Sequence, residues 1–185
     1  MEIAAHSRMA DVLRPMEAAA FAAFVEARRE RAVRVAYRLL AGDSDAAEDV
    51  AQNAFLRAHR ALAGFRGESS IDTWFYRILL REVQRHRRWR GLRLWLGGAA
   101  ELAPEPEDER ASGDPGLRRR IVDALERLSP AQREVFVLVH LEEQSVAETA
   151  AVLGKAIGTV KSHLHRALES LRHELADLSK EGRER

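Results

Sequence analysis

The sequence contains no cysteine, few aromatic residues (6%) and no long apolar run. The absence of cysteine excludes a disulfide framework and thiolate metal ligands, and it is typical of proteins in a reducing cytosol. The longest apolar runs, Ala18–Val25 and Val135–Leu141, are far shorter than the roughly 20 residues that a membrane-spanning helix needs. Residues 1–16 also contain no apolar stretch of signal-peptide length. We therefore expect a cytoplasmic protein without membrane insertion.

Strand signals are scarce as well, because Ala, Leu, Arg and Glu dominate and apolar residues recur at helical spacing. Glycine and proline interrupt the helical pattern between Gly91 and Gly116, and Glu101–Glu109 contains acidic residues without a basic one. We predict an all-α fold of two small helical domains joined by a flexible acidic linker. The expected parts are a loose N-terminal tail (1–16), a first domain (17–90), the linker (91–116), a second domain (117–178) and a charged tail (179–185).

The most specific local pattern lies between Ser145 and Leu171. Ala150 is small where two helices must approach, Gly154 can adopt positive φ at a turn, and Val160 can pack the second helix against the first. This spacing predicts a helix-turn-helix whose second helix enters a DNA major groove. The outward face of that helix carries the residues expected to contact DNA: Thr159, Lys161, Ser162, His165 and Arg166.

Two other interpretations of this helix pair are weaker. Such spacing also occurs in plain helical hairpins, and basic helix faces are often only solvated. His163 and His165 are two residues apart on a helix, so their side chains diverge, and no cysteine or nearby carboxylate set completes a metal site. We therefore expect no metal and no cofactor.

Positive charge gathers in the first domain, although the whole chain has 30 basic and 29 acidic residues. The segment Trp74–Arg93 contains seven arginines and one glutamate. Four of the arginines follow a helical spacing and form a predicted basic ridge: Arg77, Arg81, Arg85 and Arg88. Such a ridge is typical of phosphate contacts, although a solvated structural face is the alternative.

Aromatic residues stand beside this ridge. Phe65 begins a short polar loop, where it is free to stack on a base, whereas Trp74 and Phe75 are more typical of a core. The preceding helix is expected to bury Val50 and Ala54. It leaves Glu48, Asp49, Gln52 and Leu56 on another face, and we call these four residues the acidic patch. That patch either complements the helix dipole or docks a basic protein partner.

Four motifs in this order resemble the extracytoplasmic-function group of bacterial sigma factors in the sigma-70 family. The resemblance spans about residues 21–175 and involves the segments Asp45–Gln52, Phe65–Ser70, Thr73–Ile78 and Gly158–Ser162. It implies a promoter-specificity subunit with no catalytic residues, built from a sigma region 2 bundle and a sigma region 4 helix-turn-helix. The implied partners are the clamp helices and the flap of core RNA polymerase, promoter DNA and an anti-sigma protein.

The resemblance also implies a role for each group of residues. The acidic patch would bind the polymerase clamp, and the second domain would bind the −35 element through Thr159, Lys161, Ser162, His165 and Arg166. The −10 element would be bound by Phe65, Arg77, Arg81, Arg85 and Arg88, with Phe65 at the pocket for a flipped base.

The chain departs from the family pattern at two places. Leu79-Leu80-Arg81 stands where the family commonly has small residues and an asparagine, which changes the expected base preference. The apolar residues Leu92, Leu94, Trp95 and Leu96 either extend the preceding helix or contact a partner. Two rival functions remain: a stand-alone helix-turn-helix regulator, and a recombinase, which would need a larger catalytic fold than this chain provides.

Overall fold

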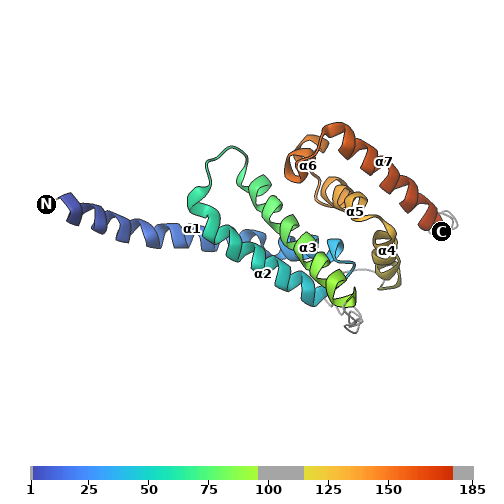
Figure 1. Cartoon of the computed structure of the whole chain (residues 1–185), viewed down its shortest axis with the longest axis horizontal. Coiled ribbons are helices and arrows are strands. Elements are labelled where there is room, and N and C mark those ends of the chain that lie inside the picture. The colour runs from blue at the N-terminus through green and yellow to red at the C-terminus, as the bar shows by residue number, and fades with distance from the viewer. Residues whose placement is uncertain (1, 96–114, 177–185) are drawn as a thin grey trace.

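The computed structural model describes residues 2–95 and 115–176, and every regular element in these ranges is helical (Figure 1). The first part contains two long helices and a shorter one between them, with one turn of 3-10 helix. These elements are α1 (Glu2–Leu39), α2 (Ser44–Ala61), η1 (Leu62–Gly64) and α3 (Ile71–Trp95). The second part contains α4 (Pro115–Arg127), α5 (Pro130–Phe136), the π-helical turn η2 (Val137–Leu141), α6 (Val146–Leu153) and α7 (Ile157–Glu174). The all-α prediction is confirmed.

Several helices begin or end at residues that cap them. The Asp43 carboxylate accepts a hydrogen bond from the Ala46 amide at the start of α2. Ser129 and Ser145 form capping boxes at α5 and α6, in which the serine and the residue three positions later satisfy one another's backbone amides. Gly154 ends α6 with φ +62°, a left-handed conformation that glycine adopts without steric cost.

The core of the first domain lies between α1, α2 and α3. Alanines let α1 and α2 approach closely, and Phe55 stacks on Phe75 with ring centroids 4.6 Å apart. Phe24 of α1 meets the Phe75 ring edge-on at 5.4 Å. The aromatic residues therefore fix the three helices around one apolar centre.

The two domains pack against each other instead of standing apart. Val137, Leu138 and Val152 of the second domain are buried in the same apolar core as the first-domain helices. Near the start of α2, Gly42 has φ +84°, and a Cβ atom there would lie 3.0 Å from Val122 of α4. The predicted pair of domains is present, but this shared core was not foreseen.

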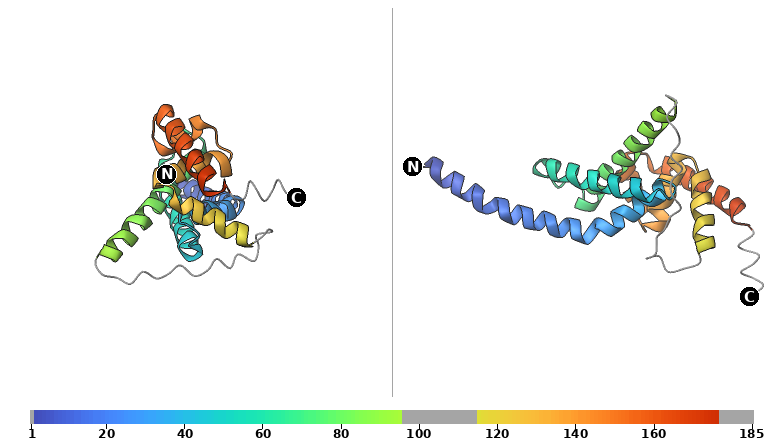
Figure 2. Two further views of the ribbon diagram at one scale, coloured as in Figure 1. Left: turned by 90° about the vertical axis from the view of Figure 1, so that its right-hand side faces the viewer. Right: turned by 90° about the horizontal axis from the view of Figure 1, so that it is seen from below.

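Helix boundaries differ from the predicted ones at both ends of the first domain. The expected loose tail, residues 1–16, lies almost wholly within α1, because this segment is rich in the strong helix formers Ala, Met, Leu and Glu. The N-terminal part of α1 extends beyond the other helices (Figure 2). Helix α3 continues past the predicted end at residue 90 to Trp95. Most of the predicted acidic linker and the charged tail fall outside the described residues.

The search for membrane spans gave a negative result for the described helices. None of them is both long enough and apolar enough to cross a bilayer.

Candidate nucleic-acid interface

Helix α7 is positioned by packing on one face only. Val160 is fully buried and forms a small apolar cluster with Val135 of α5 and Ala150 of α6. The Lys155 amide donates to the Ala150 carbonyl at 3.0 Å and closes the turn around Gly154. The predicted steric roles of Ala150, Gly154 and Val160 are therefore confirmed.

The opposite face of α7 carries the predicted DNA contacts, and all of them are exposed: Thr159, Lys161, Ser162, His165 and Arg166. The Ser162 hydroxyl donates to the Gly158 carbonyl at 3.0 Å, within the same helix. His165 Nδ1 lies 3.3 Å from Glu169 Oε2, one turn further along. None of these contacts crosses to another element, so the whole face is open to a DNA groove.

The predicted basic ridge on α3 is less uniform. Arg81 and Arg88 are exposed. The Arg85 guanidinium pairs with Glu82 on its own helix, and Glu82, which is 4% exposed, also pairs with Arg57 of α2. Arg77 Nε donates to the Ala151 carbonyl of α6 at 3.1 Å. Two of the four arginines are thus engaged inside the protein.

A cavity of about 350 Å³ opens between α2 and α3 beside this ridge. Its lining combines three arginines with two small or apolar residues and one acid: Arg57, Arg60, Arg81, Ala61, Ile78 and Glu82. Since arginine only donates hydrogen bonds, the wall suits an acceptor-rich group such as a phosphate or a base edge. Arg57 and Arg60 were not among the predicted site residues. Their spacing of three places them on one helix face, but it does not indicate that Arg81 lies opposite.

Phe65 lies at the edge of the first domain, before the loop that leads to α3. Its ring centroid is 5.2 Å from that of Trp74, and both side chains are half-buried. Trp74 packs against the apolar core, as its helical position predicted, and leaves Phe65 at the surface.

The four residues of the acidic patch are exposed along α2: Glu48, Asp49, Gln52 and Leu56. The Leu56 side chain is 50% exposed, although the other apolar residues of this helix, such as Val50 and Phe55, are buried. An exposed leucine beside acidic groups is typical of a protein-binding surface with a polar rim.

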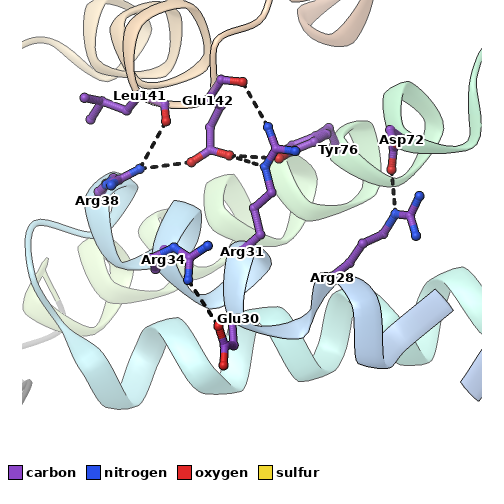
Figure 3. A network of polar contacts seen from close by, with 9 residues as sticks. All are labelled: Arg28, Glu30, Arg31, Arg34, Arg38, Asp72, Tyr76, Leu141 and Glu142. Atoms are coloured by element: carbon purple, nitrogen blue, oxygen red, sulfur yellow. Dashed lines mark hydrogen bonds and ion pairs between the residues drawn. The ribbon is translucent and has the colours of Figure 1, made fainter. Parts of the chain in front are cut away.

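A buried carboxylate joins the two domains, and no local sequence pattern indicates it. Glu142 follows η2, is 5% exposed, and accepts hydrogen bonds from three side chains of the first domain (Figure 3). Arg31 Nε lies 2.6 Å from Glu142 Oε2, Arg38 Nη1 lies 3.0 Å from Oε1, and the Tyr76 hydroxyl lies 3.0 Å from Oε2. We call these four residues the Glu142 cluster.

The Glu142 cluster perturbs the groups that form it. Burial, followed by the negative charge of Glu142, raises the pKa of Tyr76, so the phenol remains protonated and donates. The hydrogen bond to Glu142 raises the pKa of Arg31, and a second Arg31 nitrogen donates to the Glu142 carbonyl at 2.9 Å. The carboxylate is therefore held by charged donors rather than left unpaired.

A second polar contact crosses the domain boundary at the end of α1. The Leu39 carbonyl accepts from Arg87 of α3 and from Arg133 of α5, the latter at 3.2 Å. Burial lowers the pKa of Arg133 to about 10. Glu134 accepts from Arg87 at 3.4 Å and from Gln84 at 3.3 Å. The carboxyl-terminal end of α1 thus accepts hydrogen bonds from arginines of both domains.

Family comparisons agree with the division into two domains. Residues 24–93 match the family model described as Sigma-70 region 2, and residues 118–171 match the model described as Sigma-70, region 4. Relatives cover nearly the whole chain. It is 36% identical over 155 residues to the RNA polymerase sigma-E factor of Streptomyces coelicolor, covering 84% of this chain and 85% of that protein.

The ECF RNA polymerase sigma factor SigW of Bacillus subtilis is 32% identical over 173 residues, covering 86% of this chain and 90% of SigW. Among solved structures, the sigma factor RpoE of Bartonella quintana, in complex with the anti-sigma factor NepR, has a TM-score of 0.73. That match has 28% sequence identity and covers 84% of this chain and 96% of the other.

The chain therefore belongs to the extracytoplasmic-function group of the sigma-70 family. Sigma factors are non-catalytic subunits that bind core RNA polymerase and promoter DNA and determine where transcription starts. The chain is such a promoter-specificity subunit. A stand-alone helix-turn-helix regulator is not favoured, because it would not account for the region 2 match over the first domain.

Proposed function

We propose that the second domain binds the −35 promoter element through the exposed face of α7. The supporting observation is that α7 buries Val160 while its other face exposes five polar or charged side chains, which make no hydrogen bond or ion pair to another element within residues 2–95 and 115–176: Thr159, Lys161, Ser162, His165 and Arg166. A helix-turn-helix held in this way reads base edges and phosphates in the major groove.

We further propose that the first domain binds the polymerase clamp and the −10 element. The acidic patch on α2 would dock on the basic clamp helices through Glu48, Asp49, Gln52 and Leu56. The −10 contacts would come from Phe65, Arg77, Arg81, Arg85 and Arg88, next to the arginine-lined cavity. In this scheme the chain catalyses no reaction itself and acts in the cytoplasm through polymerase.

An anti-sigma protein is a further proposed partner. The structure of Bartonella quintana RpoE was solved with the anti-sigma factor NepR, and the likeness of the two sigma chains supports a similar partner here. Purification of this chain from its native cell, followed by identification of the proteins that accompany it, tests this expectation.

The main test is reconstituted transcription. Core RNA polymerase plus this chain should initiate transcription at promoters near its own gene, and the start should depend on both the −10 and the −35 sequences. Polymerase alone is the control. Tight and specific DNA binding by the chain without polymerase, together with no transcription from any of these promoters, would instead support a stand-alone regulator.

A further inference from the structure

The packing of the two domains is incompatible with the promoter-bound form of the proposed function. Helix α6 lies between α3 and α7 and contacts both of them. At about 8–10 Å between packed helices, α7 is roughly 20 Å from α3. The −10 and −35 elements are by their names about 25 base pairs apart, which is roughly 85 Å along the DNA axis at about 3.4 Å per base pair. The two proposed DNA-binding faces cannot reach both elements in this arrangement.

The closed arrangement also engages one of the proposed −10 residues. The Arg77 guanidinium donates to the Ala151 carbonyl of α6, although it belongs to the predicted basic ridge. This contact uses the Nε donor of Arg77 and ties its guanidinium to the second domain, so fewer of its donors are free to turn toward a phosphate while the domains are packed. Closure therefore restrains the first domain as well as shortening the distance between the domains.

We propose that the Glu142 cluster is a latch that keeps the free chain closed and that assembly with polymerase and promoter opens. This inference rests on the proposed function for the meaning of the open form, but the closed form is defined by the contacts alone. Glu142 contributes one carboxylate from the second domain, and Arg31, Arg38 and Tyr76 contribute three donors from the first.

The composition of the interface explains why such a latch can be reversible. On opening, Glu142, Arg31 and Arg38 regain water, which offsets much of the lost interaction between the charges. The apolar residues Leu138 and Val152, which are buried in the shared core, would become exposed to solvent at the same time. The open form therefore needs a partner surface, so the free chain stays closed while a polymerase complex can hold it open.

The latch can be weakened by removing a charge from either domain. Glu142→Gln keeps the shape of the side chain but removes the charge that holds two arginines. Arg38→Gln weakens the same contact from the first domain, where Arg38 also reaches the Leu141 carbonyl at 3.5 Å. Glu143→Gln is the matched control, because Glu143 is the adjacent glutamate and its side chain is exposed.

Interdomain distance is the direct measurement. Since the sequence contains no cysteine, spin labels can be placed at two introduced cysteines, Arg29→Cys in α1 and Arg172→Cys in α7, both at exposed positions. Double electron–electron resonance on the free full-length chain should give one short distance for the unmodified latch. Glu142→Gln and Arg38→Gln should each raise the population of longer distances by about tenfold, since each removes a charge from a contact whose carboxylate is buried while its arginines are partly exposed.

The controls separate opening from unfolding. Circular dichroism should show unchanged helix content in both latch variants, and Glu143→Gln should keep the short distance. If one of the two latch variants is unfolded, the distance measured in the other variant tests the latch. The short distance persisting in folded Glu142→Gln and Arg38→Gln would overturn the latch.

A second measurement links opening to promoter binding. In a complex with core polymerase and promoter DNA, the spin labels at positions 29 and 172 should lie a long distance apart when the Glu142 cluster is unchanged. A short distance in a complex that transcribes would overturn the proposal. Absence of transcription from every promoter would refute the proposed function instead, while the free-chain distances would still decide whether the latch exists.

Discussion

The two domains differ in how freely they present their proposed DNA contacts. The α7 side chains are exposed, and the contacts of Ser162 and His165 stay within their own helix. On α3, Arg77 is bound to α6 and Arg85 is bound to Glu82. The second domain therefore offers its proposed DNA-binding face in the closed form, whereas in the first domain separation of the domains would free Arg77 and leave Arg85 paired with Glu82 on its own helix.

The largest expected effect concerns a surface of the first domain that is exposed in the closed form. Glu48→Arg combined with Asp49→Arg should reduce polymerase binding by more than about 100-fold, because like charges would face one another in the proposed dock. Helix content should not change. Co-sedimentation with core polymerase measures the effect, with Glu26→Arg on α1 as the control. Undiminished binding by the double variant would remove the acidic patch from the proposed interface.

The next largest effect is expected on the exposed face of α7, which we propose contacts promoter DNA without any rearrangement. Lys161→Ala and Arg166→Ala should each weaken binding of the holoenzyme to promoter DNA by about 5–150-fold, the equivalent of 1–3 kcal/mol for a base contact. Arg172→Ala, in the last turn of the same helix, should have little effect. Band-shift titrations at several salt concentrations give the affinities. Equal losses for all three variants would indicate a nonspecific charge effect.

A smaller effect is expected on the ridge of the first domain. Arg81→Ala removes an exposed guanidinium beside the cavity and should reduce the salt dependence of promoter binding by about one counterion. Arg34→Ala, which disrupts a surface pair with Glu30, is the control. The slope of log affinity against log salt is the measured quantity. An unchanged slope in Arg81→Ala would contradict a phosphate contact at this residue.

The smallest predicted effect concerns stability alone. Ser145→Ala removes the N-cap of α6 and should cost about 1 kcal/mol of unfolding free energy. Hydrogen bonds from Ser145 lower the pKa of Glu148, so their contribution is present above the unfolded pKa near 4.3 and is lost as pH falls through the lower folded value. Thermal unfolding at pH 7 and pH 3 should therefore show a smaller difference between the proteins at pH 3. A difference that does not shrink would contradict the capping box.

Sequence patterns predicted the features that depend on nearby residues. Ala150, Gly154 and Val160 lie within eleven positions, and their steric roles follow from helix geometry, so the helix-turn-helix could be predicted with its turn. The outward faces of α2 and α7 followed from helical periodicity in the same way. The segment expected as a loose tail lies almost wholly within α1 instead, because strong helix formers such as Ala, Met and Leu outnumber its single proline, Pro15.

Contacts between distant residues left no such pattern. Arg31 and Glu142 are separated by 111 positions, and nothing in either local sequence pairs them. Arg77 was predicted to face DNA, but its partner is a backbone carbonyl, and backbone groups carry no sequence signature. The closed arrangement of the domains therefore became visible only in three dimensions.

Both sides of the closed interface belong to one chain. Closure is therefore a unimolecular step, and diluting the protein does not shift its equilibrium. Because the two surfaces are joined covalently, even a contact too weak to join separate molecules can be mostly formed within one chain. A contact of that strength can keep the free chain in the closed form and can still be broken when the chain binds RNA polymerase.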